Sequence, residues 1–436
     1  MRLALAKLLL IGLGIAVGTA LVEVALRIVP GLDLRVVTSF QSPPWKAWAD
    51  PAWGNPGGRA YRAEPTLVYA HGPAVDMAVP AAGHPGGTFR FRTNNLGLRR
   101  DADTVATKPP DMLRILVLGD SHTDGYVDND ESFCTLLESR LARRLPPGWR
   151  VEVLNAGIAG YSPAQEFLWY KMRGALLEPD LVLVVFYVGN DVVELEDPSK
   201  PNVDPATGRP VPSDERDPPR ISPGPGRFAS ASRLDTIRVF TLLRYAVQLG
   251  PLAPMWQQLR LPGRVTDLGG FRMDTLIQVL RACHGCFLQS LQQAAHARRH
   301  PQRMRGDIRR AAEILIRLDG EVRSDGRRLL VAVLPTFAQT DLSRSSQERS
   351  YVANLLQLDQ TDLAFEDEVE SAVLGRLLAA DVPVFSLREP LRQAALNVPQ
   401  YYGRDWHLGH LGHRTVAAAL EAEMSDRGLL PVRSAR

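Results

Sequence analysis

Five short and almost uninterrupted apolar runs, separated by stretches of helical periodicity, constrain the fold of this chain most strongly. The runs are residues 115–118, 151–154, 181–187, 329–334 and 382–385. Apolar residues recur at helical spacing in 133–145, 163–177, 308–318 and 416–424. Strands that are buried on both faces read as continuous apolar runs, and the helices between them cover those faces. The pattern predicts an α/β fold with a central parallel sheet.

The composition is that of a globular protein, and it argues against a nucleic-acid partner. The 436 residues are 45% hydrophobic and carry a formal net charge of +3, which is ordinary for a chain with a real core. The densest basic stretch, 298–310, contains no aromatic residue, whereas binding of single strands uses interleaved aromatic side chains. We therefore expect no nucleic acid among the partners.

The N-terminal segment predicts a membrane anchor. Arg2 and Lys7 precede an apolar stretch that extends to Leu26, which is just long enough to cross a bilayer. We interpret residues 1–29 as a signal anchor with one transmembrane helix, which places the rest of the chain outside the cytoplasm, in the periplasm or at the cell surface. A cleavable signal peptide is the alternative, and it would make the protein secreted.

The remaining chain divides into a lead and a main domain. Residues 30–110 are rich in Pro, Gly, Trp and Tyr and predict an extended lead with a small β element, including a strand at 88–93. Residues 111–436 form the predicted catalytic domain. An insertion at 197–301, with helices predicted at 234–248 and 275–297, interrupts this domain and serves as a lid or as decoration. Cys283 and Cys286 lie in this insertion. Without a second pair they indicate a local disulfide or two buried thiols rather than a zinc site, with a redox role as the alternative.

Polar residues with catalytic potential follow the first three apolar runs. Asp120 and Ser121 come directly after the first run, Gly160 ends a glycine-containing turn after the second, and Asn190 and Asp191 follow the third. The carboxyl ends of parallel strands meet at one edge of the sheet, where ligands bind. Ser121 is a candidate nucleophile, and Gly160 and Asn190 are candidate donors to an oxyanion. Each stretch taken alone is equally typical of a helix cap or tight turn.

A base for the serine is present near the C-terminus. Asp405 and His407 lie two residues apart just before the last helical stretch, so the carboxylate can orient the imidazole while its other nitrogen faces Ser121. His410 and His413 follow, and we expect His413 to serve the start of the last helix. We find no matching acidic cluster and predict no metal and no cofactor.

These four stretches, in this order, resemble the four sequence blocks of the SGNH (GDSL-type) hydrolases. The resemblance covers roughly residues 114–193 and 329–424. It implies a flavodoxin-like three-layer α/β/α sandwich and a serine esterase mechanism. By the resemblance, Ser121 is the nucleophile, His407 the base and Asp405 its orienter. The oxyanion donors are then the backbone N–H groups of Ser121 and Gly160 and the Asn190 amide, with Asp120 and Asp191 in support.

The spacing of the acid and base departs from many members of that family. Asp-x-His occurs here instead of Asp-x-x-His, and this shorter form is similar to SGNH-like polysaccharide O-acetyltransferases. Residues 93–99 and the N-terminal anchor are also similar to exported bacterial SGNH proteins.

The sequence thus predicts an exported, membrane-anchored serine esterase acting on a carboxylic ester, with O-acetyl esters included. The substrate would be an acylated carbohydrate or a lipid. An O-acyltransferase acting on an envelope or secreted polysaccharide is one alternative. A non-catalytic envelope scaffold or carbohydrate-binding protein is another.

Overall fold

The computed structural model describes part of the 436-residue chain. The described residues are 14, 18, 60–81, 83–196, 200–211, 293–294, 297–298, 300–346, 350, 364–402 and 406–431. The chain divides into two compact units, Met1–Gly57 with Gly224–Cys283, and Gly58–Pro223 with His284–Arg436. Apart from Gly14 and Gly18, the described residues all belong to the second unit.

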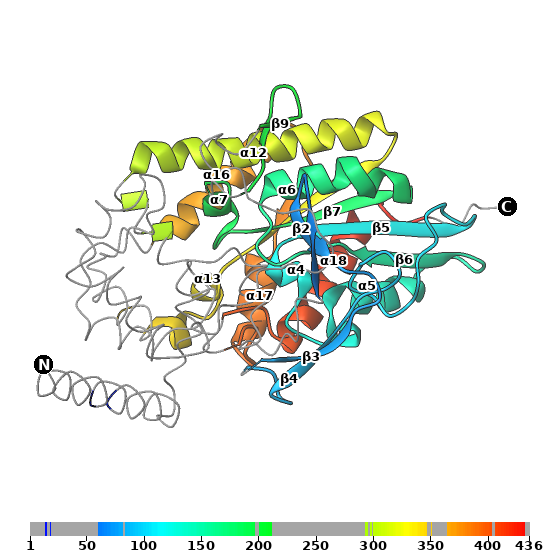
Figure 1. The fold of residues 1–436 in the computed structure, drawn as a ribbon, viewed down its shortest axis with the longest axis horizontal. Coiled ribbons are helices and arrows are strands. Elements are labelled where there is room, and N and C mark those ends of the chain that lie inside the picture. Colours follow the sequence, from blue (N-terminus) through cyan, green and yellow to red (C-terminus); the bar gives the residue numbers. More distant parts are fainter. Residues whose placement is uncertain are drawn as a thin grey trace, which may run out of the picture. The chain divides into compact units, whose positions relative to one another are not determined.

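A five-stranded parallel sheet forms the centre of this unit (Figure 1). Its strands are β5 (Met112–Gly119), β6 (Arg150–Asn155), β7 (Leu181–Tyr187), β10 (Arg328–Leu334) and β11 (Val384–Ser386). They are arranged in the order β6-β5-β7-β10-β11, so the first strand in the sequence lies between the second and the third. This is the strand order 2-1-3-4-5 of doubly wound sheets, which bind ligands between strands 1 and 3. The predicted parallel α/β sheet is confirmed.

Helices cover both faces of the sheet. They include α5 (Phe133–Ala142), α6 (Pro163–Trp169), α12 (Pro301–Ser324), α16 (Phe365–Ala379), α17 (Arg388–Ala395) and α18 (His410–Asp426). Figure 1 shows α6 and α12 on one side of the strands and α5 and α18 on the other. Every residue of β7 is buried between these layers, which explains why its sequence is apolar throughout.

One predicted helix is interrupted. The apolar spacing of 163–177 predicts a single helix, but α6 ends at Trp169 and the chain continues as a π-helical turn, Tyr170–Gly174, and a 3₁₀ turn, Ala175–Leu177. Gly174 lies within this irregular turn, and a Cβ atom there would be 2.7 Å from Cδ2 of Leu116 on the sheet. The wider turn thus brings the backbone close to β5.

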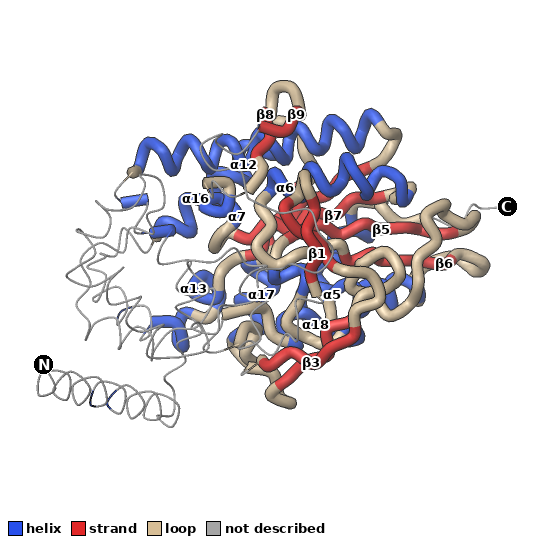
Figure 2. Tube along the Cα trace, in the orientation of Figure 1, coloured by secondary structure: helices blue, strands red, loops and turns tan. Residues whose placement is uncertain are grey.

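Two antiparallel hairpins precede the sheet in the sequence (Figures 1 and 2). The first pairs β1 (Tyr61–Glu64) with β2 (Val68–His71), and the second pairs β3 (Asp76–Pro80) with β4 (Thr88–Arg92). The strand predicted at 88–93 is therefore present as β4. A third hairpin, β8 (Asn202–Asp204) with β9 (Arg209–Val211), lies at the start of the predicted insertion.

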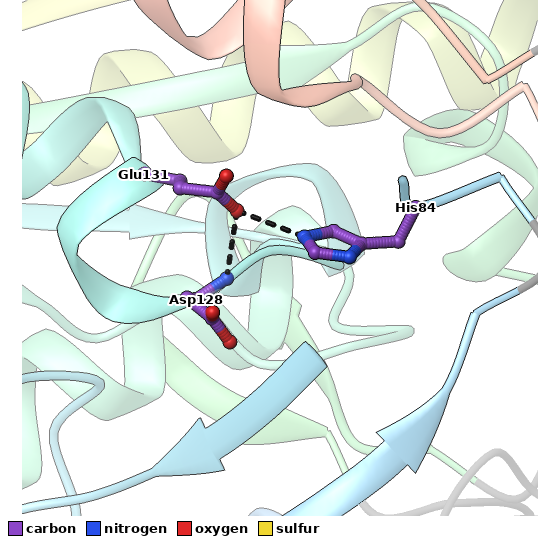
Figure 3. Close-up of side chains that lie close together, drawn as sticks. All are labelled: His84, Asp128 and Glu131. Atoms are coloured by element: carbon purple, nitrogen blue, oxygen red, sulfur yellow. Dashed lines mark hydrogen bonds and ion pairs between the residues drawn. The ribbon is translucent and has the colours of Figure 1, made fainter. Parts of the chain in front are cut away.

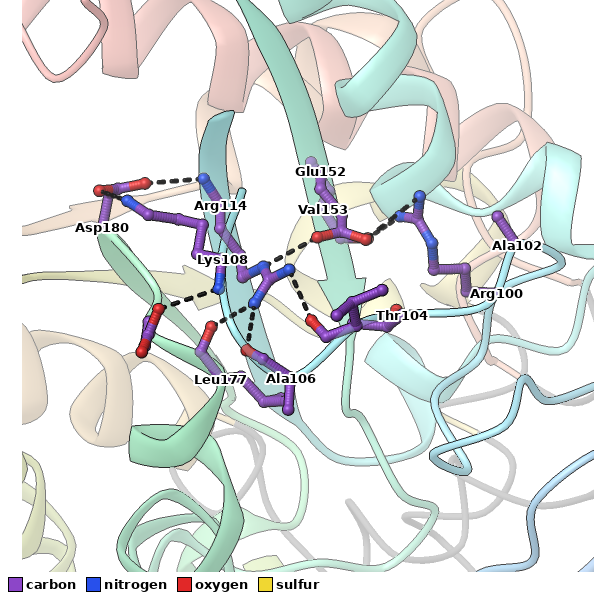
Figure 4. Close-up of polar contacts among 12 residues, drawn as sticks. Arg100, Ala102, Thr104, Ala106, Lys108, Arg114, Glu152, Val153, Leu177 and Asp180 are labelled. Carbon is purple, nitrogen blue, oxygen red and sulfur yellow. Dashed lines mark hydrogen bonds and ion pairs between the residues drawn. The ribbon is translucent and has the colours of Figure 1, made fainter. Parts of the chain in front are cut away.

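Arg114 holds the amino-terminal edge of the sheet together (Figure 4). It is fully buried on β5, and its Nε donates to Glu152 Oε2 on the neighbouring strand at 2.8 Å. The rest of the guanidinium donates to the backbone carbonyls of Val105, Ala106 and Leu177 at 2.9, 2.8 and 2.5 Å. This network lies at the edge opposite to the one where the candidate catalytic residues are expected.

Several predictions from the sequence fall on residues outside the described ranges. The anchor at 1–29 is described only at Gly14 and Gly18, which are helical. Across the described ranges we find no helix with the length and apolarity that crossing a membrane requires. The helix predicted at 234–248, most of the helix at 275–297, and Cys283 and Cys286 also lie outside the described residues. These assignments and the domain boundaries remain predictions.

Candidate active site

Ser121 occupies a tight turn between β5 and the short helix α4 (Ser121–Asp124). Asp120 is the N-cap residue of this helix, and its Oδ1 accepts a hydrogen bond from the His122 backbone N–H at 2.9 Å. A Cβ atom on the preceding Gly119 would lie 2.1 Å from Oγ1 of Thr123. The turn therefore needs glycine before the Asp-Ser pair, and it presents Ser121 at the carboxyl edge of the sheet.

The structure brings Ser121 and His407 into hydrogen-bond contact. Ser121 Oγ and His407 Nε2 are 3.0 Å apart, although the two residues are separated by 286 positions in the sequence. Each residue is 6% exposed. At this distance the imidazole can take the hydroxyl proton, which is the requirement for an activated serine nucleophile.

The loop that carries His407 is held by backbone pairing and by a strained residue. The Tyr402 N–H donates to the His407 carbonyl at 2.9 Å, and Tyr401 pairs with Leu408 in an antiparallel bridge. Trp406 has a φ of +60° and is buried, with its ring 4.7 Å from that of Phe337. A bulky residue in this region costs about 1–3 kcal/mol and persists only where packing enforces it. Asp405 lies outside the described residues, so its orienting role stays a prediction.

His122 supports this loop as a neutral acceptor. Burial, together with the neighbouring His407 and His413, lowers its pKa well below the ordinary value. Its Nδ1 accepts a hydrogen bond from the Leu408 backbone N–H at 3.2 Å, which a protonated imidazole could not do. Its ring lies 5.0 Å from that of His407 and 3.8 Å from that of Tyr187. His122 directly follows the candidate nucleophile, but no sequence pattern marks it as a part of the site.

Asn190 is positioned by one of the two predicted supporting acids. It is the buried N-cap residue of α7 (Asp191–Glu194), directly after β7, and its side chain hydrogen-bonds the Asp120 carboxyl group. Asp120 also accepts from Ser121 Oγ at 3.4 Å. An amide nitrogen carries two N–H groups, so a hydrogen bond to Asp120 is compatible with donation to an oxyanion. Asp120 thus contacts both the candidate nucleophile and a candidate oxyanion donor.

Asp191, the second supporting acid, belongs to a group of buried carboxyls. Its Oδ2 accepts from the Tyr187 backbone N–H at 2.8 Å. Burial raises its pKa well above the ordinary value, and the charges of Asp120 and Glu166 add to this. The pKa of Glu166 is raised well above its ordinary value by burial and by Asp120. Through its bond to the Tyr187 N–H, Asp191 contacts the last residue of β7, the strand that leads to Asn190.

The Gly160 loop is joined to the serine turn by backbone contacts. The Ile158 N–H donates to the Gly119 carbonyl at 3.0 Å. A Cβ atom on Gly157 would be 2.5 Å from the backbone nitrogen of Asp124 in α4. Gly160 has a φ of +75°, a conformation that favours glycine. Within the described ranges, the backbone N–H groups of Ser121 and Gly160 donate to no protein acceptor.

Asp124 links this loop to the serine helix and to the N-terminal lead. Its Oδ1 accepts from Arg99 Nη1 at 3.1 Å, and its Oδ2 lies 3.3 Å from both His71 Nε2 and the Ala159 backbone nitrogen. Burial opposes the ionisation of Asp124, but His71 and Arg99 outweigh it and lower the pKa. No sequence pattern predicts Asp124, His71 or Arg99 as parts of the site, although Arg99 ends the stretch 93–99, which resembles exported SGNH proteins.

His84, Asp128 and Glu131 form a cluster of possible metal ligands (Figure 3). The ligand atoms of His84, Asp128 and Glu131 lie within 4.8 Å of one another. His84 Nε2 is 2.9 Å from Glu131 Oε2, which also accepts from the Asp128 N–H at 3.3 Å. Asp128 in turn accepts from the Arg90 backbone N–H. These contacts cap η2 (Asn129–Glu131) and account for the cluster without an ion.

Comparisons with known proteins find only remote structural similarity. No protein-family model matches the chain, and no curated protein matches it. The acetylxylan esterase Axe2 from Geobacillus stearothermophilus is 11% identical, with a TM-score of 0.36 over 72% of this chain and 94% of that one. The acetyl xylan esterase AlAXEase is 11% identical, with a TM-score of 0.34 over 71% and 98%. LAE5, an alpha/beta hydrolase from the metagenome of Lake Arreo in Spain, is 12% identical, with a TM-score of 0.35 over 72% and 94%. Similarity at this level assigns neither a family nor an activity.

Proposed function

We propose that the chain is a serine esterase that hydrolyses a carboxylic ester through an acyl-serine intermediate. The observation that carries this proposal is the 3.0 Å contact between Ser121 Oγ and His407 Nε2 at the carboxyl edge of the sheet. The contact joins β5 to a loop from the far end of the sequence, so local structure alone does not require it. A buried serine–imidazole pair is the minimal arrangement for nucleophilic acyl transfer.

In the proposed reaction, Ser121 Oγ attacks the ester carbonyl while His407 Nε2 takes its proton. The tetrahedral oxyanion accepts hydrogen bonds from the backbone N–H groups of Ser121 and Gly160 and from the Asn190 amide. The C–O bond to the alcohol then breaks, and His407 returns the proton to the leaving oxygen. Water, deprotonated by His407, then attacks the acyl-serine, the bond from the acyl carbon to Ser121 Oγ breaks, and His407 returns the proton to Oγ as the acid is released. Asp405 would orient the imidazole throughout.

We further propose that the enzyme is of the SGNH type and is exported. The order of the four sequence blocks supports the type, as does the strand order β6-β5-β7-β10-β11, which places Ser121 and Asn190 at the switch between the first and third strands. Arg2 and Lys7 before the apolar stretch support an anchor at 1–29 with the catalytic domain outside the cytoplasm.

Acyl transfer is a second candidate, because Asp405 and His407 have the Asp-x-His spacing that resembles SGNH-like O-acetyltransferases. The steps up to the acyl-serine are shared, and a sugar hydroxyl replaces water as acceptor. An assay with an acetyl donor and oligosaccharide acceptors separates hydrolysis from acyl transfer. If only hydrolysis of the donor is observed with every acceptor tested, transfer is excluded.

Labelling with a fluorophosphonate probe tests the proposed function on the full chain. Wild type should be labelled at Ser121, Ser121→Ala should not be labelled, and His407→Ala should react far more slowly. Ser371→Ala, an exposed serine on α16, is the control and should behave as wild type. Labelling of Ser121→Ala at the wild-type rate would contradict the proposal. Absence of labelling in the wild type would favour a non-catalytic scaffold or carbohydrate-binding role.

A further inference from the structure

A tyrosine from the N-terminal lead contacts the peptide that carries one proposed oxyanion donor. The N–H of Gly160 belongs to the peptide unit whose carbonyl is that of Ala159. Tyr69 Oη donates a hydrogen bond to this carbonyl at 2.8 Å, across 90 positions of sequence. Tyr69 is 1% exposed, so the hydrogen bond forms away from bulk water.

The hydrogen bond from Tyr69 affects the donor strength of the Gly160 N–H. The carbonyl and the N–H of one peptide are conjugated, so a hydrogen bond accepted by the oxygen polarises the N–H. Chains of hydrogen bonds strengthen one another in this way in a low-dielectric interior. The backbone N–H of Ala159 donates to Asp124 Oδ2 at 3.3 Å. Ala159 is therefore held on one side by the serine helix and on the other by Tyr69.

The β1–β2 hairpin is itself fixed to this loop, so Tyr69 has a defined position. Gln165 Nε2 donates to the Leu67 carbonyl at 2.8 Å, and Tyr161 Oη donates to the Tyr69 carbonyl. The rings of Tyr69 and Tyr161 pack edge to face, with centroids 5.3 Å apart. Val68, just before Tyr69, has a φ of +71°, a conformation that is unfavourable for a β-branched residue.

We propose that Tyr69 is a positioning residue of the oxyanion site. Its hydroxyl orients the Ala159–Gly160 peptide and strengthens the Gly160 N–H as a donor to the developing negative charge. Tyr69 acts through this peptide and does not touch the substrate. The proposal rests on the proposed function, since it requires an oxyanion at Gly160.

The substitution Tyr69→Phe tests this role, because it removes the donor and keeps the ring. Loss of an entire oxyanion donor lowers turnover by ~10²–10³-fold, and a weakened donor should cost a part of this, about tenfold in kcat, with KM changed less than about twofold. Tyr170→Phe is the matched control, since Tyr170 is also buried but donates to Oδ2 of Asp325, the C-cap residue of α12, at 2.6 Å. It should keep the wild-type kcat.

The rate of fluorophosphonate labelling separates failure of this inference from failure of the proposed function. If wild type is labelled at Ser121 and Tyr69→Phe is labelled about tenfold more slowly, the inference is supported. If both are labelled at the same rate, or if Tyr69→Phe raises KM at constant kcat, Tyr69 has no such role. If wild type shows neither labelling nor ester hydrolysis, the proposed function fails and this inference fails with it.

A second variant keeps the test decisive if Tyr69→Phe does not fold. A monofluorinated tyrosine at position 69 retains the ring and the hydroxyl but is a stronger hydrogen-bond donor. We expect it to raise the labelling rate above that of the wild type. A purely structural role predicts no increase, so an unchanged or lower rate would overturn the proposal.

Discussion

The substitution Arg99→Met should destabilise the fold by about 3 kcal/mol, at the lower end of the ~3–5 kcal/mol that removing one partner of a buried ion pair costs. Arg99 is 1% exposed and donates to Asp124 Oδ1 at 3.1 Å, to Asn129 Oδ1 at 3.2 Å and to the carbonyls of Gly125 and Val127 at 3.1 and 2.9 Å. Methionine fills much of the space of the arginine stem but supplies no donor.

The magnitude follows from what remains around Asp124 in the variant. Its carboxylate would stay buried, but His71 Nε2 and the Ala159 backbone nitrogen would each still lie 3.3 Å from Oδ2, which is why the lower end of the range applies. Adding Asp124→Asn to Arg99→Met removes the uncompensated charge. The double variant should therefore be less destabilised than the sum of the two single variants, by about 1 kcal/mol or more.

Urea unfolding of the full chain, followed by tryptophan fluorescence, measures these free energies. Arg92→Met is the control, because its side chain is 42% exposed and its contact with Asp101 at 3.2 Å lies at the surface. Such a pair contributes about 0–1 kcal/mol. If Arg99→Met costs no more stability than Arg92→Met, or if the double variant loses at least the sum of the single losses, the buried pair of Arg99 and Asp124 does not stabilise the fold as proposed.

Three further predictions follow from the site. Asn190→Ala should lower kcat by ~10²–10³-fold with little change in KM, and steady-state kinetics showing a raised KM at unchanged kcat would contradict the oxyanion role. Burial lowers the pKa of His413 to about 3, so below about pH 6.5 the unfolded chain binds a proton that the folded chain does not. Wild type should lose about 1.6 kcal/mol through this residue between pH 6.5 and 5. The Phe133 N–H donates to His413 Nδ1 at 3.1 Å, and His413→Asn keeps an acceptor for it. Over the same pH range this variant should lose less free energy of unfolding in urea than the wild type. Equal losses would show that His413 is not the source of the pH dependence. Gly157→Ala places a Cβ atom 2.5 Å from the backbone of α4 and should greatly slow the labelling of Ser121. Gly375→Ala is the control, because a Cβ atom there would meet nothing within 4 Å, and it should leave the labelling rate unchanged. Equal labelling rates for the two variants would count against close packing of the Gly157 loop on the serine turn.

The positions of the strands and the contact between Ser121 and His407 could be predicted, because the strands depend on apolar runs and the contact depends on where the strands end. The run 181–187 coincides with β7, since a strand covered on both faces must be apolar at every position. The end of an apolar run also predicts which residue lies at the carboxyl edge of the sheet. Parallel strands bring such residues to one edge, whatever their separation in the sequence.

The supporting contacts could not be predicted, because they depend on three-dimensional neighbours without a sequence period. His413 was expected to serve the start of the last helix, but its Nδ1 accepts from the Phe133 N–H at the start of α5. Tyr69 and Arg99 lie in a lead without helical periodicity, and their partners are fixed only when the hairpins pack against the sheet. In a sequence, a buried arginine or tyrosine is indistinguishable from an exposed one.

The contacts of the β1–β2 hairpin also determine where the chain can be shortened. A fragment limited to the predicted domain 111–436 would contain Ser121 and His407 but would lack Tyr69, His71 and Arg99, and so would lose the partners of Asp124 and of the Ala159 carbonyl. Proteolytic cleavage before residue 60 would leave Tyr69, His71 and Arg99 in the remaining protein. A cut after residue 71 would separate the hairpin from the Ala159 carbonyl and from Asp124, which it contacts. The N-terminal lead is thus an integral part of the folded catalytic unit. Its removal should inactivate the protein, although it contains none of the residues proposed to react with the substrate.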